Sequence, residues 1–131
     1  MKKLIYIVFA LSLSFTGQLY SQSRSKQCFS LEKNTNGKIE KTYVIIFTDG
    51  KTVEADVQKE LTQANNSYSR SWEMEGSIER ETITFIVPQG TVDVFKNDQN
   101  PIHGPKPIEK WTFKSDQLII DENVFKAVNC K

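Results

Sequence analysis

The most constraining feature of this 131-residue sequence is that apolar residues recur at every second position. Residues 52–57 show it most clearly, because three apolar side chains alternate there with polar ones. Such alternation is typical of a β-strand that buries one face and exposes the other. A β-branched and aromatic run precedes it at residues 42–47, and Asp49-Gly50 lies between the two. Asp-Gly between two strand-like runs predicts a tight hairpin.

Further strand-like segments follow along the chain at roughly even spacing. They are residues 68–75, 81–87, 91–95, 109–114, 117–121 and 124–128. Residues 97–107 contain three prolines and one glycine, so we expect a loop there. No stretch has a convincing helical pattern. Short, evenly spaced strands predict an all-β fold, an antiparallel up-and-down barrel or sandwich of about eight strands.

Length and charge narrow the class of protein further. A chain of this size fits one domain, and its 38% hydrophobic content is typical of a globular fold. Removing Lys2 and Lys3 from the 17 basic residues leaves 15, against 16 acidic ones. A domain of net charge near −1 has no strong field for phosphate backbones, so we expect no nucleic-acid partner.

The first segment has the pattern of a secretory signal peptide. Two lysines precede the apolar run 4–15, and a more polar stretch with small residues follows it. The run has about 12 residues, whereas a helix needs roughly 20 to span a bilayer. We therefore expect a signal peptide at residues 1–21, a single β domain at 22–131, and no stable membrane anchor after cleavage.

Two cysteines stand near the two ends of the expected domain. Cys28 lies near its start, and Cys130 is the penultimate residue. An exported protein meets oxidising conditions, in which a pair of cysteines predicts a disulfide. We expect a Cys28–Cys130 bridge, which requires Cα atoms roughly 4.4–6.8 Å apart. The expected location is the periplasm or the exterior.

Residues able to carry catalysis are sparse. The single histidine, His103, lies in the proline-rich loop, and no serine stands in a nucleophile-elbow context. We therefore predict a non-enzymatic protein without catalytic, cofactor-binding or metal-binding residues. Ile102 and His103 are candidate contact residues, because long loops often carry specific contacts.

Four large aromatic residues are candidates for a ligand cavity. A barrel of eight strands either holds a small ligand or fills its interior with side chains, and both alternatives stay open here. The four residues are Trp72, Phe85, Trp111 and Phe113.

Three stretches together resemble a small bacterial lipocalin-like domain. They are residues 47–53 around the predicted hairpin, residues 72–78, and residues 111–120. The resemblance implies a barrel that holds an apolar ligand, although the Gly-x-Trp signature of true lipocalins is missing. The end of the chain, Val128-Asn129-Cys130, is similar to that of periplasmic inhibitors of C-type lysozyme. Their inhibitory motif has no match at residues 66–70, so no inhibitory residue is carried over.

These features lead to two functional expectations. The first is an exported binding domain for a small apolar ligand or an envelope component. The alternative is a protein-binding inhibitor module of the lysozyme-inhibitor type. A cavity larger than roughly 300 Å³ would favour the first, and a filled barrel with a protruding loop at Ile102 and His103 would favour the second.

Overall fold

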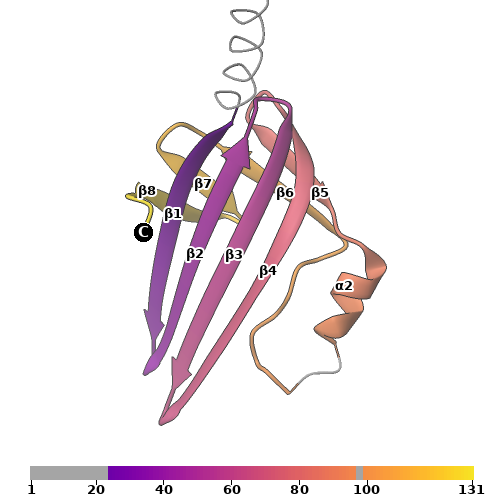
Figure 1. The fold of residues 1–131 in the computed structure, drawn as a ribbon. Coiled ribbons are helices and arrows are strands. Elements are labelled where there is room, and N and C mark those ends of the chain that lie inside the picture. The colour runs from indigo at the N-terminus through magenta and orange to yellow at the C-terminus, as the bar shows by residue number, and fades with distance from the viewer. Residues whose placement is uncertain (1–23, 97–98) are drawn as a thin grey trace, which may run out of the picture.

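A computed structural model describes residues 24–96 and 99–131, which form eight strands and one short helix (Figure 1). The first four strands are long: β1 Ser25–Thr35, β2 Lys38–Thr48, β3 Thr52–Gln63 and β4 Asn66–Glu79. The last four are short: β5 Thr82–Ile86, β6 Ile108–Phe113, β7 Gln117–Ile120 and β8 Asn123–Val128. The helix α2, Gln89–Val94, lies between β5 and β6. The expected signal peptide, residues 1–21, lies outside the described residues.

The eight strands form one closed antiparallel barrel. Each strand pairs with the next along the chain, and β1 pairs with β8 to complete the ring. This result confirms the predicted all-β fold and selects the up-and-down barrel over the sandwich. The β1–β8 contact is short, because only residues 28–30 of β1 pair with 126–128 of β8. No described helix has the length and hydrophobicity of a membrane-spanning one.

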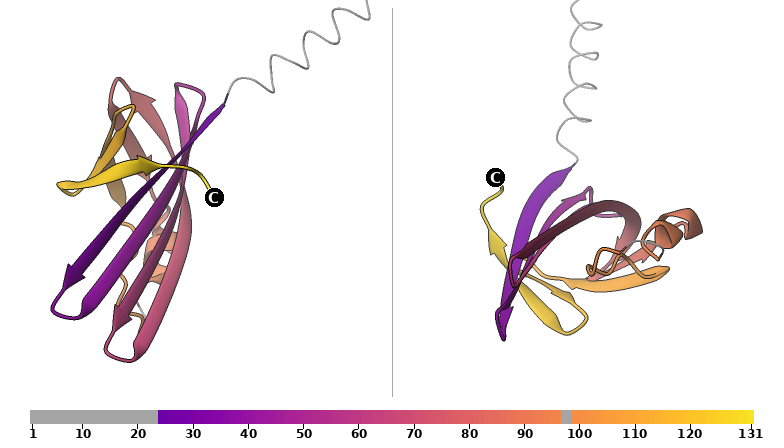
Figure 2. Two further views of the ribbon diagram at one scale, coloured as in Figure 1. Left: turned by 90° about the vertical axis from the view of Figure 1, so that its left-hand side faces the viewer. Right: turned by 90° about the horizontal axis from the view of Figure 1, so that it is seen from below.

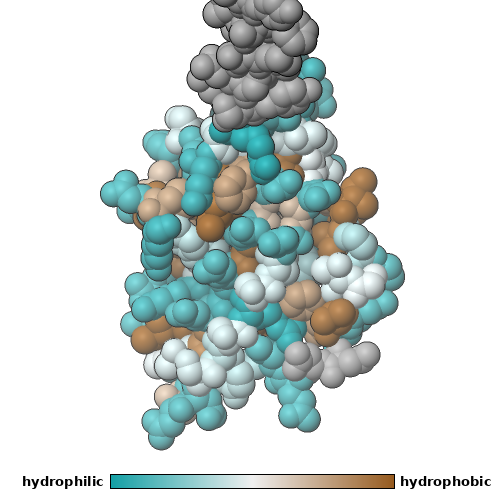
Figure 3. Space-filling view, viewed as in Figure 1, coloured by the Kyte–Doolittle hydropathy of each residue, from teal (hydrophilic) through white to brown (hydrophobic). Residues whose placement is uncertain are grey.

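The alternating pattern of the sequence separates the core from the surface. In β3 the side chains of Val53, Ala55 and Val57 are buried, while Thr52 and Glu54 between them are exposed. Inward residues of the other strands join them in one apolar core. The outer face of β1–β4 is mostly hydrophilic (Figure 3).

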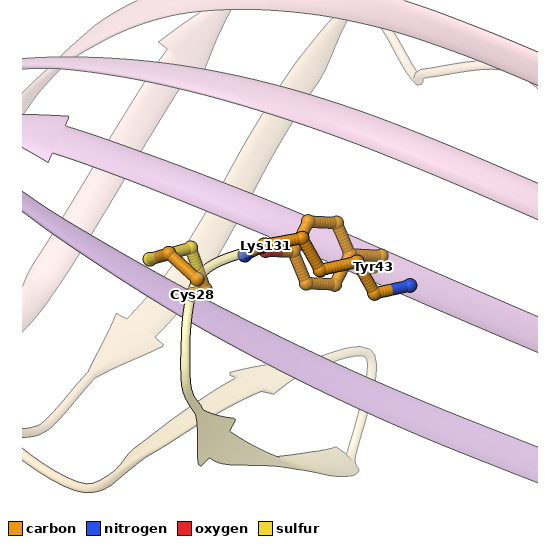
Figure 4. Close-up of a disulfide and its surroundings, with 4 residues drawn as sticks. Cys28, Tyr43 and Lys131 are labelled. Atoms are coloured by element: carbon orange, nitrogen blue, oxygen red, sulfur yellow. A yellow bond between two sulfur atoms is a disulfide. The ribbon is translucent and has the colours of Figure 1, made fainter.

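The predicted disulfide joins Cys28 to Cys130, with the two Cα atoms 5.2 Å apart. Cys28 lies on the outer side of β1, and the chain end crosses that strand to reach it (Figure 4). Past the bridge, the backbone N–H of Lys131 donates a hydrogen bond to Tyr43 Oη at 3.2 Å. The bridge therefore fastens the chain end beside the short β1–β8 contact.

The turn between β2 and β3 is the hairpin that Asp49-Gly50 predicts. Asp49 Oδ1 accepts hydrogen bonds from the backbone N–H groups of Lys51 and Thr52, both at 2.8 Å. These bonds lower the pKa of the Asp49 carboxyl below its usual value, the bond from Thr52 contributing most.

The prediction of a strand at residues 91–95 is wrong, because this part of the chain is helical. Pro88 precedes the helix and cannot donate to a strand ladder, while its carbonyl accepts a hydrogen bond from the Val92 N–H at 3.2 Å. Val92 is buried, but Val94 is 69% exposed. The two valines imitate a strand pattern in the sequence, yet they do not share a face.

Unequal strand lengths divide the barrel into two sections. In the closed section all eight strands are paired. In the open section, residues 31–35 of β1 and 66–75 of β4 extend beyond their pairing with β8 and β5. Only β1–β4 continue there, as a curved sheet, and α2 with the segment after it lies beside β4 (Figures 1 and 2).

Candidate ligand-binding cavity

A cavity of about 830 Å³ opens in the open section, between the concave face of β1–β4 and the segment that follows α2. Core side chains, among them Val57, Trp111 and Phe125, form one of its walls. The apolar lining residues are Leu31, Val57, Trp72, Val92, Phe95, Ile102, Trp111, Ile120 and Phe125. Charged side chains occur around them, at Lys33, Glu40, Lys59, Lys96, Lys106, Glu109 and Asp121.

The segment after α2 is held against β4 by three contacts. Phe95 packs edge-on against Trp72, with ring centroids 5.4 Å apart. The guanidinium of Arg70 lies 4.5 Å from the centroid of the same phenyl ring. Asn100 Nδ2 donates to the Ser69 carbonyl at 3.2 Å. This carbonyl belongs to the part of β4 that has no β5 partner, so the segment covers the strand edge that β5 leaves open.

A glycine allows this segment to fold back on itself. Any Cβ at Gly104 would collide with the ring of Phe95. The backbone at Gly104 therefore comes closer to the phenyl ring than another residue type allows. Phe95 is fixed between this backbone and the face of β4, where it forms part of the cavity wall.

The structure places the four candidate aromatic residues in two groups. Trp72 and Trp111 line the cavity. Phe85 is fully buried and packs against Trp111, with ring centroids 4.6 Å apart. Phe113 packs against Phe29 at 5.8 Å. Neither phenylalanine is among the lining residues, so both belong to the core behind the cavity.

The candidate contact residues of the loop also reach the cavity. Ile102 is only 7% exposed and lines the cavity, while His103 is exposed beside it. Both also line a smaller adjoining cavity of about 170 Å³ that is bounded by β2 and β3. The loop therefore packs across the open section instead of projecting into solvent.

Each carboxylate that lines the large cavity already has a described donor. Glu109 accepts from the Trp111 indole N–H at 3.0 Å and from the Lys106 backbone N–H at 2.8 Å. Asp121 pairs with Lys106 Nζ at 3.0 Å. Glu40 pairs with Lys38 Nζ at 3.2 Å. The negative charges of the cavity are thus largely compensated from within the protein.

Lys59 differs from these groups, and sequence reasoning did not single it out. It follows Val57 on the inward face of β3 and is half-buried. Within the part of the chain that the structure describes, no carboxylate lies within ion-pair distance of its ammonium. Burial lowers the pKa of Lys59 below its usual value, although Glu40, Glu109 and Asp121 favour the charged form. The signal was a lysine at an inward position of an alternating strand.

The Trp72 ring, which Lys59 contacts, carries a buried N–H group. Lys59 Nζ lies 5.5 Å from the centroid of the Trp72 ring. The indole Nε1 of Trp72 is buried and has no hydrogen-bond partner among the described residues. Buried N–H groups are normally paired. The Lys59 ammonium thus borders the cavity, whereas the Trp72 indole N–H is enclosed by protein and is not accessible from it.

In residues 24–96 and 99–131, no three His, Cys, Asp or Glu side chains gather where they could hold a metal ion. The comparisons with known proteins add no family to these observations. No family model matches the chain, and no curated protein or solved structure is significantly similar to it.

Proposed function

We propose that this protein is a non-enzymatic, exported barrel that binds a small apolar molecule or envelope component in its open section. The observation that carries the proposal is the cavity of about 830 Å³ with its apolar wall. Small-molecule sites typically measure roughly 300–1,000 Å³ and are lined mainly by apolar and aromatic side chains with a few polar groups. This cavity has that size and that mixture.

Export is supported by the disulfide together with the expected signal peptide. A bridge between Cys28 and Cys130 is compatible with an oxidising compartment outside the cytoplasm. The resemblance to lipocalin-like domains stays part of the proposal, and the closed eight-stranded barrel supports it at the level of shape. The site of action is the periplasm or the exterior.

The alternative, an inhibitor that binds another protein, would draw support from a loop that projects into solvent. Ile102 is instead turned inward and lines the cavity. The position of the loop therefore favours the binding of a small molecule.

Native mass spectrometry of the protein purified from its own cells would test the proposal directly. We expect a retained small molecule that is released on unfolding. Titration with a neutral fluorescent dye, N-phenyl-1-naphthylamine, gives a second measurement. Leu31→Trp should block binding, because Leu31 lines the cavity.

Glu32→Trp is the matched control, since the neighbouring side chain lies on the exposed side of the same strand. It should bind the dye like the wild type. Absence of any retained molecule together with absence of dye binding would refute the proposal. Equal binding by both variants would place the dye outside the cavity and would also count against it.

A further inference from the structure

The charged side chains that line the cavity differ in whether they have a close partner of opposite charge or a hydrogen-bond partner. The carboxylates of Glu40, Glu109 and Asp121 have donors at 2.8–3.2 Å. Lys59 has no carboxylate within ion-pair distance among the described residues. A desolvated ammonium without a counter-ion is costly. Lys59 therefore lacks a directly paired anion among the described residues, although Glu40, Glu109 and Asp121 attract it at longer range.

The single ammonium also restricts the anion. Lys59 Nζ lies over the Trp72 ring, 5.5 Å from its centroid, at the wall of the cavity. One ammonium matches one negative charge, which a carboxylate carries, whereas a phosphate group carries about −1.5 to −2. Beyond this contact the wall becomes apolar, with Val57 next to Lys59 on the inward face and Trp111 across the cavity.

We propose that the ligand is an amphipathic carboxylate, with its carboxylate on Lys59 and its apolar body against the core wall. The proposal rests on the function proposed above and adds the chemical class of the ligand. Lys59 is the residue that selects this class, because its half-buried ammonium has no carboxylate within ion-pair distance among the described residues.

Paired titrations with dodecanoate and 1-dodecanol test this selectivity, because the two probes share a chain and differ in the headgroup. Calorimetry gives the affinities. Tryptophan fluorescence gives an independent signal, since both tryptophans of the chain line the cavity. The wild type should bind dodecanoate more tightly. Lys59→Met should weaken dodecanoate binding by about 10- to 100-fold, the range for a lost charged hydrogen bond.

The binding of 1-dodecanol should change little in Lys59→Met, because methionine keeps the apolar stem. Lys59→Arg keeps the positive charge and should restore most of the preference for the carboxylate. Lys33→Met is the matched control, since Lys33 lines the same cavity but is solvent-exposed. An exposed charge contributes little, so it should change dodecanoate binding by about threefold or less.

The outcomes separate the ligand class from the function itself. If both probes bind equally well and Lys59→Met changes neither, the carboxylate proposal fails and the apolar-ligand function stands. If Lys33→Met weakens dodecanoate as much as Lys59→Met does, general attraction accounts for the effect and the proposal also fails. If neither probe binds the wild type, both proposals fail. Urea unfolding of Lys59→Met checks its fold, and its midpoint should not decrease because a desolvated charge is removed.

Discussion

The closed and open sections of the barrel contain the same four long strands, yet their interiors differ. In the closed section the inward side chains of all eight strands meet, and Phe29, Ile46 and Phe85 are fully buried. In the open section the same strands continue without β5 and β8, and the interior contains a cavity of about 830 Å³. An eight-stranded barrel is close to the size that side chains can fill. The comparison teaches that unequal strand length, not the number of strands, creates the space here.

The closed and open sections also differ in the charged side chains of their interiors. None of the buried residues is charged or polar in the described chain, so the closed core is purely apolar. Inward positions of the open section include Lys59 on β3 and Glu40 on β2. A single strand such as β3 therefore runs from a core environment at Val53 to a site environment at Lys59. The four predictions below test this difference, starting with the largest effect.

Removing the disulfide should have the largest effect, because the bridge fastens the short β1–β8 contact that closes the ring. For a loop of about 100 residues, chain-entropy arguments give an upper estimate of about 4–5 kcal/mol for the loss of stability. Cys28→Ser/Cys130→Ser should therefore unfold at a much lower urea concentration. Reductant should shift the wild type to the same midpoint and leave the double variant unchanged. An unchanged midpoint in the reduced wild type would show that strand pairing alone closes the barrel.

The same leucine-to-alanine change in each section compares their packing directly. Leu118 on β7 is fully buried in the closed section, so Leu118→Ala should cost about 3 kcal/mol. Leu31 already borders a cavity and is half-buried, so Leu31→Ala should cost about 1 kcal/mol. Urea unfolding of both variants gives the two values. Equal losses would mean that the open section is packed as tightly as the closed one.

Gly76 lies on β4 at the start of its pairing with β5. A Cβ there would collide with the carbonyl oxygen of Thr84 and would reach 2.8 Å from Phe85 Cδ1. Gly76→Ala should therefore cost about 2 kcal/mol through overpacking in the closed section. Gly90 in α2 faces open space, so Gly90→Ala should be neutral or stabilising by about 0.5–1 kcal/mol. Thermal unfolding of the two variants would measure the contrast, and a tolerated Gly76→Ala would disprove close packing at this position.

The smallest effect concerns the pH dependence of the β2–β3 turn. The folded-state pKa of Asp49 is lowered, so its carboxylate stabilises the fold above its unfolded pKa, and this contribution is lost as the pH falls through the folded pKa. The difference in urea midpoint between wild type and Asp49→Asn should be constant near neutral pH and should disappear in acid. Glu60→Gln on β3 is a suitable control, because its side chain is exposed. A difference that does not change with pH would assign the effect to turn geometry alone.

Much of the closed section could be predicted from the sequence. Alternation in residues 52–57 and the Asp-Gly turn are local signals, because a period of two and a turn residue act over a few positions. The bridge between Cys28 and Cys130 followed from the pairing of cysteines in exported proteins. Trp72 and Trp111 were candidates for the cavity and do line it.

The open section was harder to predict, because it forms where β1 and β4 extend past the ends of their neighbours β8 and β5. Nothing in residues 66–75 shows that β5 ends before pairing with them. The helix was missed because Val92 and Val94 imitate strand alternation. Phe85 lies in the core behind the cavity because it pairs with Gly76 in the closed section, a register that the sequence of these short strands does not specify. Lys59 offered a readable signal, a charge at an inward position.

The short contact between β1 and β8 has a consequence for how the chain reaches its fold. Every other pairing joins neighbouring strands, whereas this one joins residues about 100 positions apart, with the bridged cysteines 102 positions apart. Because closing the larger loop costs more entropy, we expect the hairpins to form first and the β1–β8 pairing last. Until the ring closes, residues 28–30 of β1 and 126–128 of β8 lack their strand partners and can pair with other molecules. Formation of the Cys28–Cys130 bridge should therefore shorten the time in which the nascent barrel is prone to aggregation.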